Sequence, residues 1–196
     1  MYRIRLLGIF LILMVALFLT ANTTVMENFQ QHCYAMITPI EEESIESSKI
    51  IKTECFNTFA DSIFAATNGR VRLEPSVLPE SVTETTLKSG IEPGSLNSQA
   101  VIGIDWDYSV FSGSSYTWVV SGETGCTSTT QFSISSMPTG RDNRVSSARG
   151  YSGCNYCYHY QNTSFGGSSI ACSTSGCAAM GLLDNATSSE GWRYNP

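Results

Sequence analysis

A six-residue phrase occurs twice in the second half of the chain, and this repeat constrains the fold more than any other feature. Residues 142–147 read Asp-Asn-Arg-Val-Ser-Ser, and residues 184–189 read Asp-Asn-Ala-Thr-Ser-Ser. Before each copy stands an aromatic residue, then four residues, then a Phe-x-Gly sequence, at 106–113 and at 160–167. The two phrases start 42 residues apart. Because a repeat of about 40 residues is usually one supersecondary unit that buries its face against its neighbour, we expect two copies of one β unit.

Short segments with alternating apolar residues fill the rest of this half. Strands are predicted at 101–104, 116–120 and 131–135 in the first copy, and at 156–160, 169–172 and 178–183 in the second. Gly and Ser separate these segments, and no helical stripe interrupts them, which favours two packed sheets. Gly113 and Gly167 each follow an aromatic residue closely, so a sharp turn with positive φ is expected at both.

The order aromatic, four residues, Phe-x-Gly, and then Asp/Asn-Asp/Asn-x-x-Ser/Thr-Ser resembles the Greek-key motif of the βγ-crystallin superfamily. The resemblance covers residues 101–193, about half of the chain. It implies a mainly β fold with two Greek-key repeats in one β-sandwich, which we place at residues 99–196.

The resemblance also implies a calcium-binding role for the two loops, with ligands exchanged between them. Each Ca²⁺ would take an acidic or amide side chain from one loop and a backbone carbonyl plus a hydroxyl from the other. Carried over to this chain, the ligands are Asp142, Asn143, Arg144 (carbonyl) and Ser146 in the first loop, and Asp184, Asn185, Ala186 (carbonyl) and Ser188 in the second.

Two observations on the loop residues themselves bear on this expectation. Asp, Asn and Ser also stabilise tight loops without any ion, by bonding to the nearby backbone. Each loop carries one carboxylate, and Arg144 adds a positive charge to the first. We therefore expect two weak sites, in the range of about 10⁻⁴ to 10⁻³ M that extracellular calcium modules occupy.

The N-terminus has the pattern of an export signal. Arg3 and Arg5 precede an apolar run of 14 residues, Leu6 to Leu19, and Ala21 is a suitable last residue before cleavage. The run is shorter than the 20 or so apolar residues of a membrane span. Residues 1–21 are predicted to be a signal peptide, so the mature chain would be secreted and have no stable membrane association. An uncleaved anchor is the alternative.

Residues 22–98 are predicted to form a helical segment and a linker. Thr38, Pro39 and Glu41 have the pattern of a helix start. Apolar residues then recur at spacings of three and four, at Ile45, Ile51, Cys55, Phe56, Phe59, Ile63 and Phe64. Asn68 and Gly69 are suitable for the left-handed turn at a helix end. We expect a helix over 39–67 whose apolar stripe packs on the β domain or on a strand over Val71–Leu73, followed by a Pro- and Ser-containing linker over 74–98. A pro-segment or a partner-binding helix is the alternative.

Seven cysteines follow the signal, and an exported chain meets an oxidising compartment in which they pair. We favour bonds between Cys172 and Cys177 and between Cys126 and Cys154. The remaining cysteines, Cys33, Cys55 and Cys157, then compete for one further bond, since sequence alone does not fix connectivity. A zinc ribbon built from Cys154, Cys157, Cys172 and Cys177 is the alternative.

Charge and motifs narrow the function. The net charge is −6 and lysine is absent after Lys88, so no basic patch for nucleic acid exists. The chain has two histidines, His32 and His159, and none of the common hydrolase or nucleotide-binding motifs. A dyad of Cys157 and His159 would lack a third, orienting group. We therefore expect a protein that is not an enzyme.

Two non-enzymatic functions follow from the resemblance. The first is a secreted, Ca²⁺-binding structural module. The second is a secreted peptidase inhibitor, because some exported bacterial inhibitors share a crystallin-like fold. In that case the loop Ser121–Thr130 around Cys126 would contact an extracellular protease.

Overall fold

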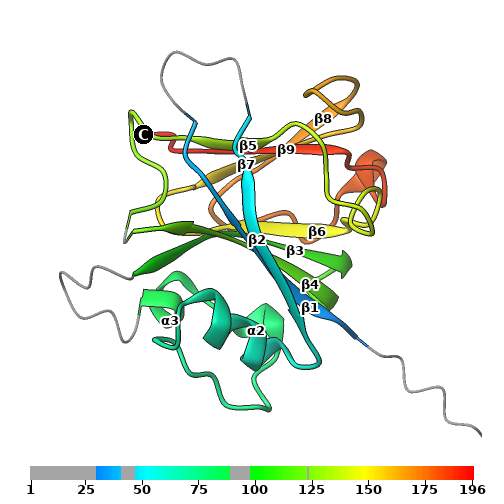
Figure 1. Cartoon of the computed structure of the whole chain (residues 1–196). Coiled ribbons are helices and arrows are strands. Elements are labelled where there is room, and N and C mark those ends of the chain that lie inside the picture. The colour runs from blue at the N-terminus through cyan, green and yellow to red at the C-terminus, as the bar shows by residue number, and fades with distance from the viewer. Residues whose placement is uncertain (1–29, 41–46, 89–97, 123) are drawn as a thin grey trace, which may run out of the picture.

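Two β-sheets pack face to face, and two short helices cover the outer face of the larger sheet (Figure 1). The computed structural model describes residues 30–40, 47–88, 98–122 and 124–196. The first sheet has the order β2 (Ile50–Phe56), β1 (His32–Ile37), β4 (Ser112–Ser121), β3 (Gln99–Tyr108), β6 (Ser147–Gly150). The second has the order β5 (Phe132–Ile134), β9 (Ser189–Arg193), β7 (Tyr156–Tyr160), β8 (Ser169–Cys172). Only the β1–β4 pair is parallel.

The two repeats exchange strands. The first repeat contributes β3, β4 and β6 to one sheet, but its β5 pairs with β9 in the other. In return, Cys177 of the second repeat forms a β-bridge with Ala148 on β6. Each repeat therefore has one segment in the sheet of the other repeat. This is the Greek-key arrangement that the resemblance implied. The predicted strand over 178–183 is wrong: after the single bridge the chain turns into a 3₁₀ helix, η2 (Gly181–Leu183).

Around β1, β3 and β4, both faces of the first sheet are buried, in two separate apolar clusters. Between the sheets lie Ile102, Trp118 and Trp192, each with no exposed surface. On the outer face, Trp106 and Ile104 of β3 pack with Ile63 of the helix α2 (Phe59–Ala66). The expectation that this apolar stripe packs on the β domain is confirmed for α2.

The predicted helix over 39–67 is otherwise wrong. Residues 50–56 form the edge strand β2, and residues 41–46 lie outside the described part of the chain. Thr38 does not cap a helix, because its hydroxyl accepts a hydrogen bond from the Lys49 amide at the open end of the β1–β2 pair (3.0 Å). The helix cap is Thr58, whose Oγ1 accepts from the Asp61 amide at 3.1 Å. Local start signals occur at both threonines, and strand pairing decides between them.

The end of α2 agrees with the sequence. Thr67 is its C-cap, and Asn68 and Gly69 both have positive φ, 53° and 79°. The Gly69 amide donates to the Phe64 carbonyl at 2.7 Å and closes the last turn. Within the predicted linker lie two short helices, η1 (Pro79–Ser81) and α3 (Glu84–Lys88); residues 89–97 are outside the described part.

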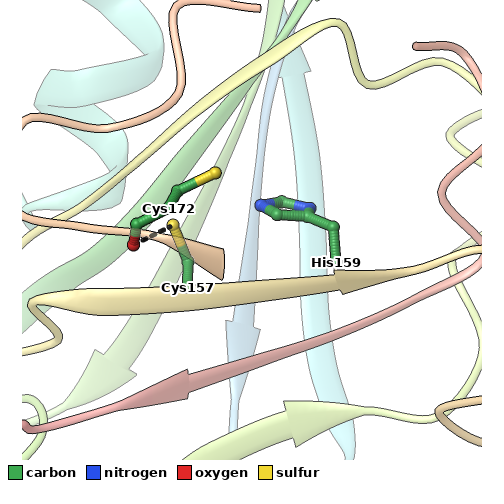
Figure 2. A group of neighbouring side chains, drawn as sticks. All are labelled: Cys157, His159 and Cys172. Carbon is green, nitrogen blue, oxygen red and sulfur yellow. Dashed lines mark hydrogen bonds between the residues drawn. The ribbon is translucent and has the colours of Figure 1, made fainter. Parts of the chain in front are cut away.

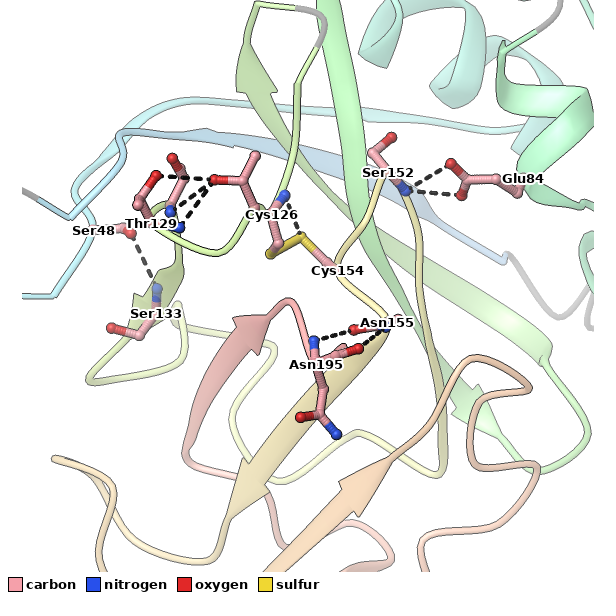
Figure 3. The surroundings of a disulfide bond; sticks show 11 residues. Ser48, Glu84, Cys126, Thr129, Ser133, Ser152, Cys154, Asn155 and Asn195 are labelled. Carbon is pink, nitrogen blue, oxygen red and sulfur yellow. Dashed lines mark hydrogen bonds between the residues drawn. A yellow bond between two sulfur atoms is a disulfide. The ribbon is translucent and has the colours of Figure 1, made fainter.

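Three disulfides brace the fold. Cys126–Cys154 and Cys172–Cys177 form as expected, and Cys33–Cys55 joins the neighbouring strands β1 and β2. Cys157 remains a buried thiol. Figure 3 shows that the Cys126–Cys154 bond connects the segment before β5 to the β6–β7 connection, where Glu84 also accepts from the Ser152 amide. Three bonds of this kind fit an oxidising compartment.

The predicted signal peptide, residues 1–21, lies outside the described part of the chain. Among the residues that are described, no helix has the length and apolar character needed to cross a membrane.

Candidate functional site

The second serine of each repeated phrase locks a hairpin turn. Ser147 Oγ donates to the Tyr108 carbonyl at 2.6 Å and accepts from the Phe111 amide at 2.9 Å. Ser189 makes the same two contacts, with the Asn162 carbonyl (2.6 Å) and the Phe165 amide (3.0 Å). These serines are therefore structural.

Gly113 and Gly167 follow these turns with φ of 83° and 75°, as predicted. A Cβ on Gly113 would lie 2.6 Å from the ring of Tyr108. Just before them, Phe111 contacts Trp106 edge-on and Phe165 contacts Tyr160 in the same way. The two aromatic phrases thus build equivalent turns.

The two Asp-Asn loops lie side by side and bond to each other reciprocally. The backbone N–H of Asn143 donates to the Thr187 carbonyl, and the backbone N–H of Asn185 donates to the Val145 carbonyl, both at 3.0 Å. Asn143 and Asn185 both have positive φ, 58° and 52°. Each Asp-Asn pair is thereby placed against the first serine of the opposite loop.

The second half of the described chain, from β3 to β9, contains two consecutive Greek keys with exchanged strands and facing Asp-Asn-x-x-Ser-Ser loops. It has a βγ-crystallin fold.

Two solved structures are similar to part of this chain. A βγ-crystallin from an archaeon matches with 15% identity and a TM-score of 0.34, over 46% of this chain and 95% of its own. A βγ-crystallin from Ciona intestinalis matches with 18% identity and a TM-score of 0.34, over 47% of this chain and 98% of its own. No family profile matches the chain, and no curated protein is detectably similar to it.

The crystallin-type loops define two composite sites, which differ in charge. The first is a pocket of about 350 Å³ between Ser146 on one loop and Asp184 and Asn185 on the other. Ser146 Oγ lies 3.4 Å from Asn185 Oδ1, to which it donates. The turn residues 107–109 complete the lining.

The guanidinium of Arg144 also lines this first site. Arg144 Nη2 forms an ion pair with Asp107 Oδ2, and Arg141 Nη1 binds the other oxygen of the same carboxylate at 2.6 Å. Arg141 is buried, whereas the Arg144 side chain is half exposed. The donor set here includes oxygen ligands, but a cation is already built into the chain, so this site does not fit Ca²⁺.

The second site is related to the first by the repeat and lacks that cation. It brings together Asp142 and Asn143 of one loop and Ser188 of the other, since the Asn143 amide bonds to the residue before Ser188. Ala186 stands where the first loop has Arg144, and Gln161 stands where the first turn has Asp107. Asp142 is exposed, and it has no ion pair in the described part of the chain. This donor set fits a weakly bound Ca²⁺.

The predicted ligands thus form two groups, each with residues from both loops. Calcium binding at these groups stays a prediction. Asp107 is the residue that sequence reasoning missed. Its signal was its place directly after Trp106 in the first aromatic phrase, where its equivalent in the second phrase is uncharged.

The other cysteine and histidine residues do not form an exposed reactive site. Figure 2 shows Cys157 and His159 on the same side of β7, with Cys172 reaching toward them from β8. Their ligand atoms lie within 4.8 Å of one another, but all three residues are buried. Burial raises the pKa of the Cys157 thiol well above its usual range, so it is a poor nucleophile. The zinc ribbon is wrong, because Cys154, Cys172 and Cys177 are in disulfides.

His159 is fully buried, although it stands between two tyrosines on β7. It lies between the sheets with Asp105 of β3 and Glu190 of β9, all at 1% exposure or less. Burial lowers the pKa of His159 to about 3, raises that of Asp105 to about 6 and raises that of Glu190 well above its usual range. The cluster was not predicted, because its members come from three strands that are far apart in the sequence.

Proposed function

We propose that this chain is a secreted, non-enzymatic crystallin-type module that binds one Ca²⁺ weakly, at the site of Asp142, Asn143 and Ser188. The observation that carries the proposal is the difference between the two loops. Asp184 in the first site and Asp142 in the second are both exposed and have no ion pair in the described part of the chain, but the first site also holds the Arg144 guanidinium, whereas the second has Ala186 at the equivalent position. The expected number of calcium sites is thereby reduced from two to one.

The function of the bound ion would be to stabilise the fold. Asp142 would supply the charge, Ser188 a hydroxyl, and Asn143 an amide oxygen, while the reciprocal amide bonds hold the loops together. An ion that binds only the folded state raises its stability by mass action. Three disulfides and the N-terminal signal support an extracellular setting, where calcium is abundant.

The described part of the loop Ser121–Thr130 does not support the peptidase-inhibitor alternative. Cys126 in the loop Ser121–Thr130 is buried, and its amide is bonded to the Ser152 carbonyl at 3.1 Å. Thr127 Oγ1 accepts from the Thr129 and Thr130 amides, which folds the loop into a compact turn. Among the described residues of this loop, no contact favours a protease as partner.

Thermal unfolding with and without calcium tests the proposal. At 10 mM Ca²⁺ and a Kd of about 1 mM, the gain is about 1.4 kcal/mol, which corresponds to a rise in Tm of a few degrees. Asp142→Asn should lose most of this rise. Asp184→Asn is the matched control, because Asp184 belongs to the arginine-filled site, and it should retain the rise. The proposal fails if calcium leaves the Tm of the wild type unchanged, or if both variants respond alike.

A further inference from the structure

A cluster of metal-binding side chains lies in the interior between the sheets, away from the two loops. Asp105 projects from β3, and His159 and Glu190 stand directly opposite each other on β7 and β9. One carboxylate oxygen of each acid and one ring nitrogen of the histidine all lie within 4.8 Å of one another. The three side chains converge from two sheets on one point.

The polar atoms of this cluster have few partners in the protein. Both ring nitrogens of His159 and both carboxylate oxygens of Glu190 are buried without a hydrogen bond of acceptable geometry. His159 Nδ1 does lie 3.2 Å from Glu190 Oε1, so the two groups touch, but they are not aligned for a bond. Native interiors leave few polar atoms unpaired, and four in one place need an explanation. A cation that accepts an electron pair from one ring nitrogen and from the Glu190 carboxylate would account for three of the four, while the other ring nitrogen keeps its proton.

The charge of the cluster calls for a cation of charge two. Asp105 and Glu190 together carry two negative charges when ionised, and the nearby Arg141 is already paired with Asp107. Two buried carboxylates without a cation are costly in a low dielectric. A divalent ion makes the group electrically neutral.

The donor set selects the class of ion. One imidazole nitrogen with two carboxylate oxygens suits Zn²⁺ and its neighbours in the first transition series. Ca²⁺ and Mg²⁺ prefer oxygen ligands only and six or more of them, whereas this buried cluster offers an imidazole nitrogen and two carboxylates. Trp118 Nε1 donates to Asp105 Oδ2 at 2.8 Å and would fix the orientation of that ligand, as outer hydrogen bonds do in metal sites.

We propose that Asp105, His159 and Glu190 form a buried site for one transition-metal ion of the Zn²⁺ class, which joins β3 of one sheet to β7 and β9 of the other. The ligands are at most 1% exposed, so the folded protein offers the ion no direct path. The metal must therefore enter while the chain folds.

Refolding of the untagged chain, with its disulfides intact, tests the site. The chain is unfolded in denaturant without reductant and refolded in chelator-treated buffer with or without a slight excess of Zn²⁺. Bound metal is then measured by mass spectrometry after gel filtration, and Tm is recorded. We expect one Zn²⁺ per chain, a higher Tm than for the metal-free sample, and visible absorption from Co²⁺ when it replaces Zn²⁺.

Variants separate this site from the loops. Glu190→Gln and His159→Gln should each lose the bound Zn²⁺ and the rise in Tm, while Asp142→Asn should keep both. If the acids were merely neutral carboxyl groups, Glu190→Gln would fold with equal or higher Tm and the wild type would retain no metal. Absence of metal from the refolded wild type overturns the proposal even if a variant does not fold. Equal retention of Zn²⁺ by wild type and Glu190→Gln overturns it as well.

Discussion

At the scale of single residues, the repeated phrase divides its work between its two serines. The second serine is buried and joins two backbone groups of a hairpin turn, in both copies. The first serine faces the opposite loop, where Ser146 meets Asn185. The second serine of the phrase therefore stabilises a turn in both copies, and the adjacent first serine is the position for which we propose a calcium ligand in the second copy.

The clamp predicts unequal effects of two neighbouring substitutions. Ser147→Ala leaves the Phe111 amide and the Tyr108 carbonyl without their partner, so the free energy of unfolding should fall by about 1–3 kcal/mol. Ser146→Ala loses one long hydrogen bond and should cost less than about 1 kcal/mol. Urea unfolding in calcium-free buffer measures both. Equal losses in the two variants would contradict the division of roles.

At the scale of elements, the chain before β3 is part of the domain. Strand β1 lies parallel to β4 and is joined to β2 by the Cys33–Cys55 bond. The segment of η1 and α3 docks on the β6–β7 connection. The Val82 carbonyl accepts from Tyr151 (3.3 Å) and Arg149 (3.2 Å) there.

The docking of this segment should weaken in alkali. Burial raises the pKa of Tyr151 from 10.0 to about 12, so its contribution to stability is complete below pH 10 and is lost as pH rises toward 12. A shift of this size corresponds to about 3 kcal/mol. Tyr151→Phe should be less stable than the wild type at neutral pH, and the difference should shrink between pH 10 and 12. A difference in stability that stays constant over this range would show that folding does not change the pKa of Tyr151.

At the scale of the whole molecule, the sequence predicted the two β repeats but not the strands that precede them. The positive φ of Gly113 and Gly167, the paired aromatic turns and two disulfides follow from local patterns. Strand β2 was missed because it is an exposed edge strand, held by a disulfide and by pairing with β1, and neither leaves a periodic signal.

The charges of the site also depended on tertiary structure. Arg144 could be read as a positive charge in the first loop, but its pairing with Asp107 required the fold, since 37 residues separate them. The same holds for Asp105, His159 and Glu190, which meet only when the sheets close on each other. The sequence shows that such charged residues are present, but their spacing along the chain does not show which of them meet in the fold.

A calcium titration followed by amide NMR tests most directly whether the Arg144 guanidinium keeps Ca²⁺ from one of the two proposed loop sites. A guanidinium about 5 Å from the ion in a water-like dielectric costs about 1–2 kcal/mol, so removing it should tighten the first site by about tenfold. In the wild type, amides around Asn143 and Ser188 should shift with calcium along one saturable curve. In Arg144→Gln, amides around Ser146 and Asn185 should show a second curve, while Ser188→Arg should abolish the first. Two occupied sites in the wild type, or no second curve in Arg144→Gln, would contradict the account.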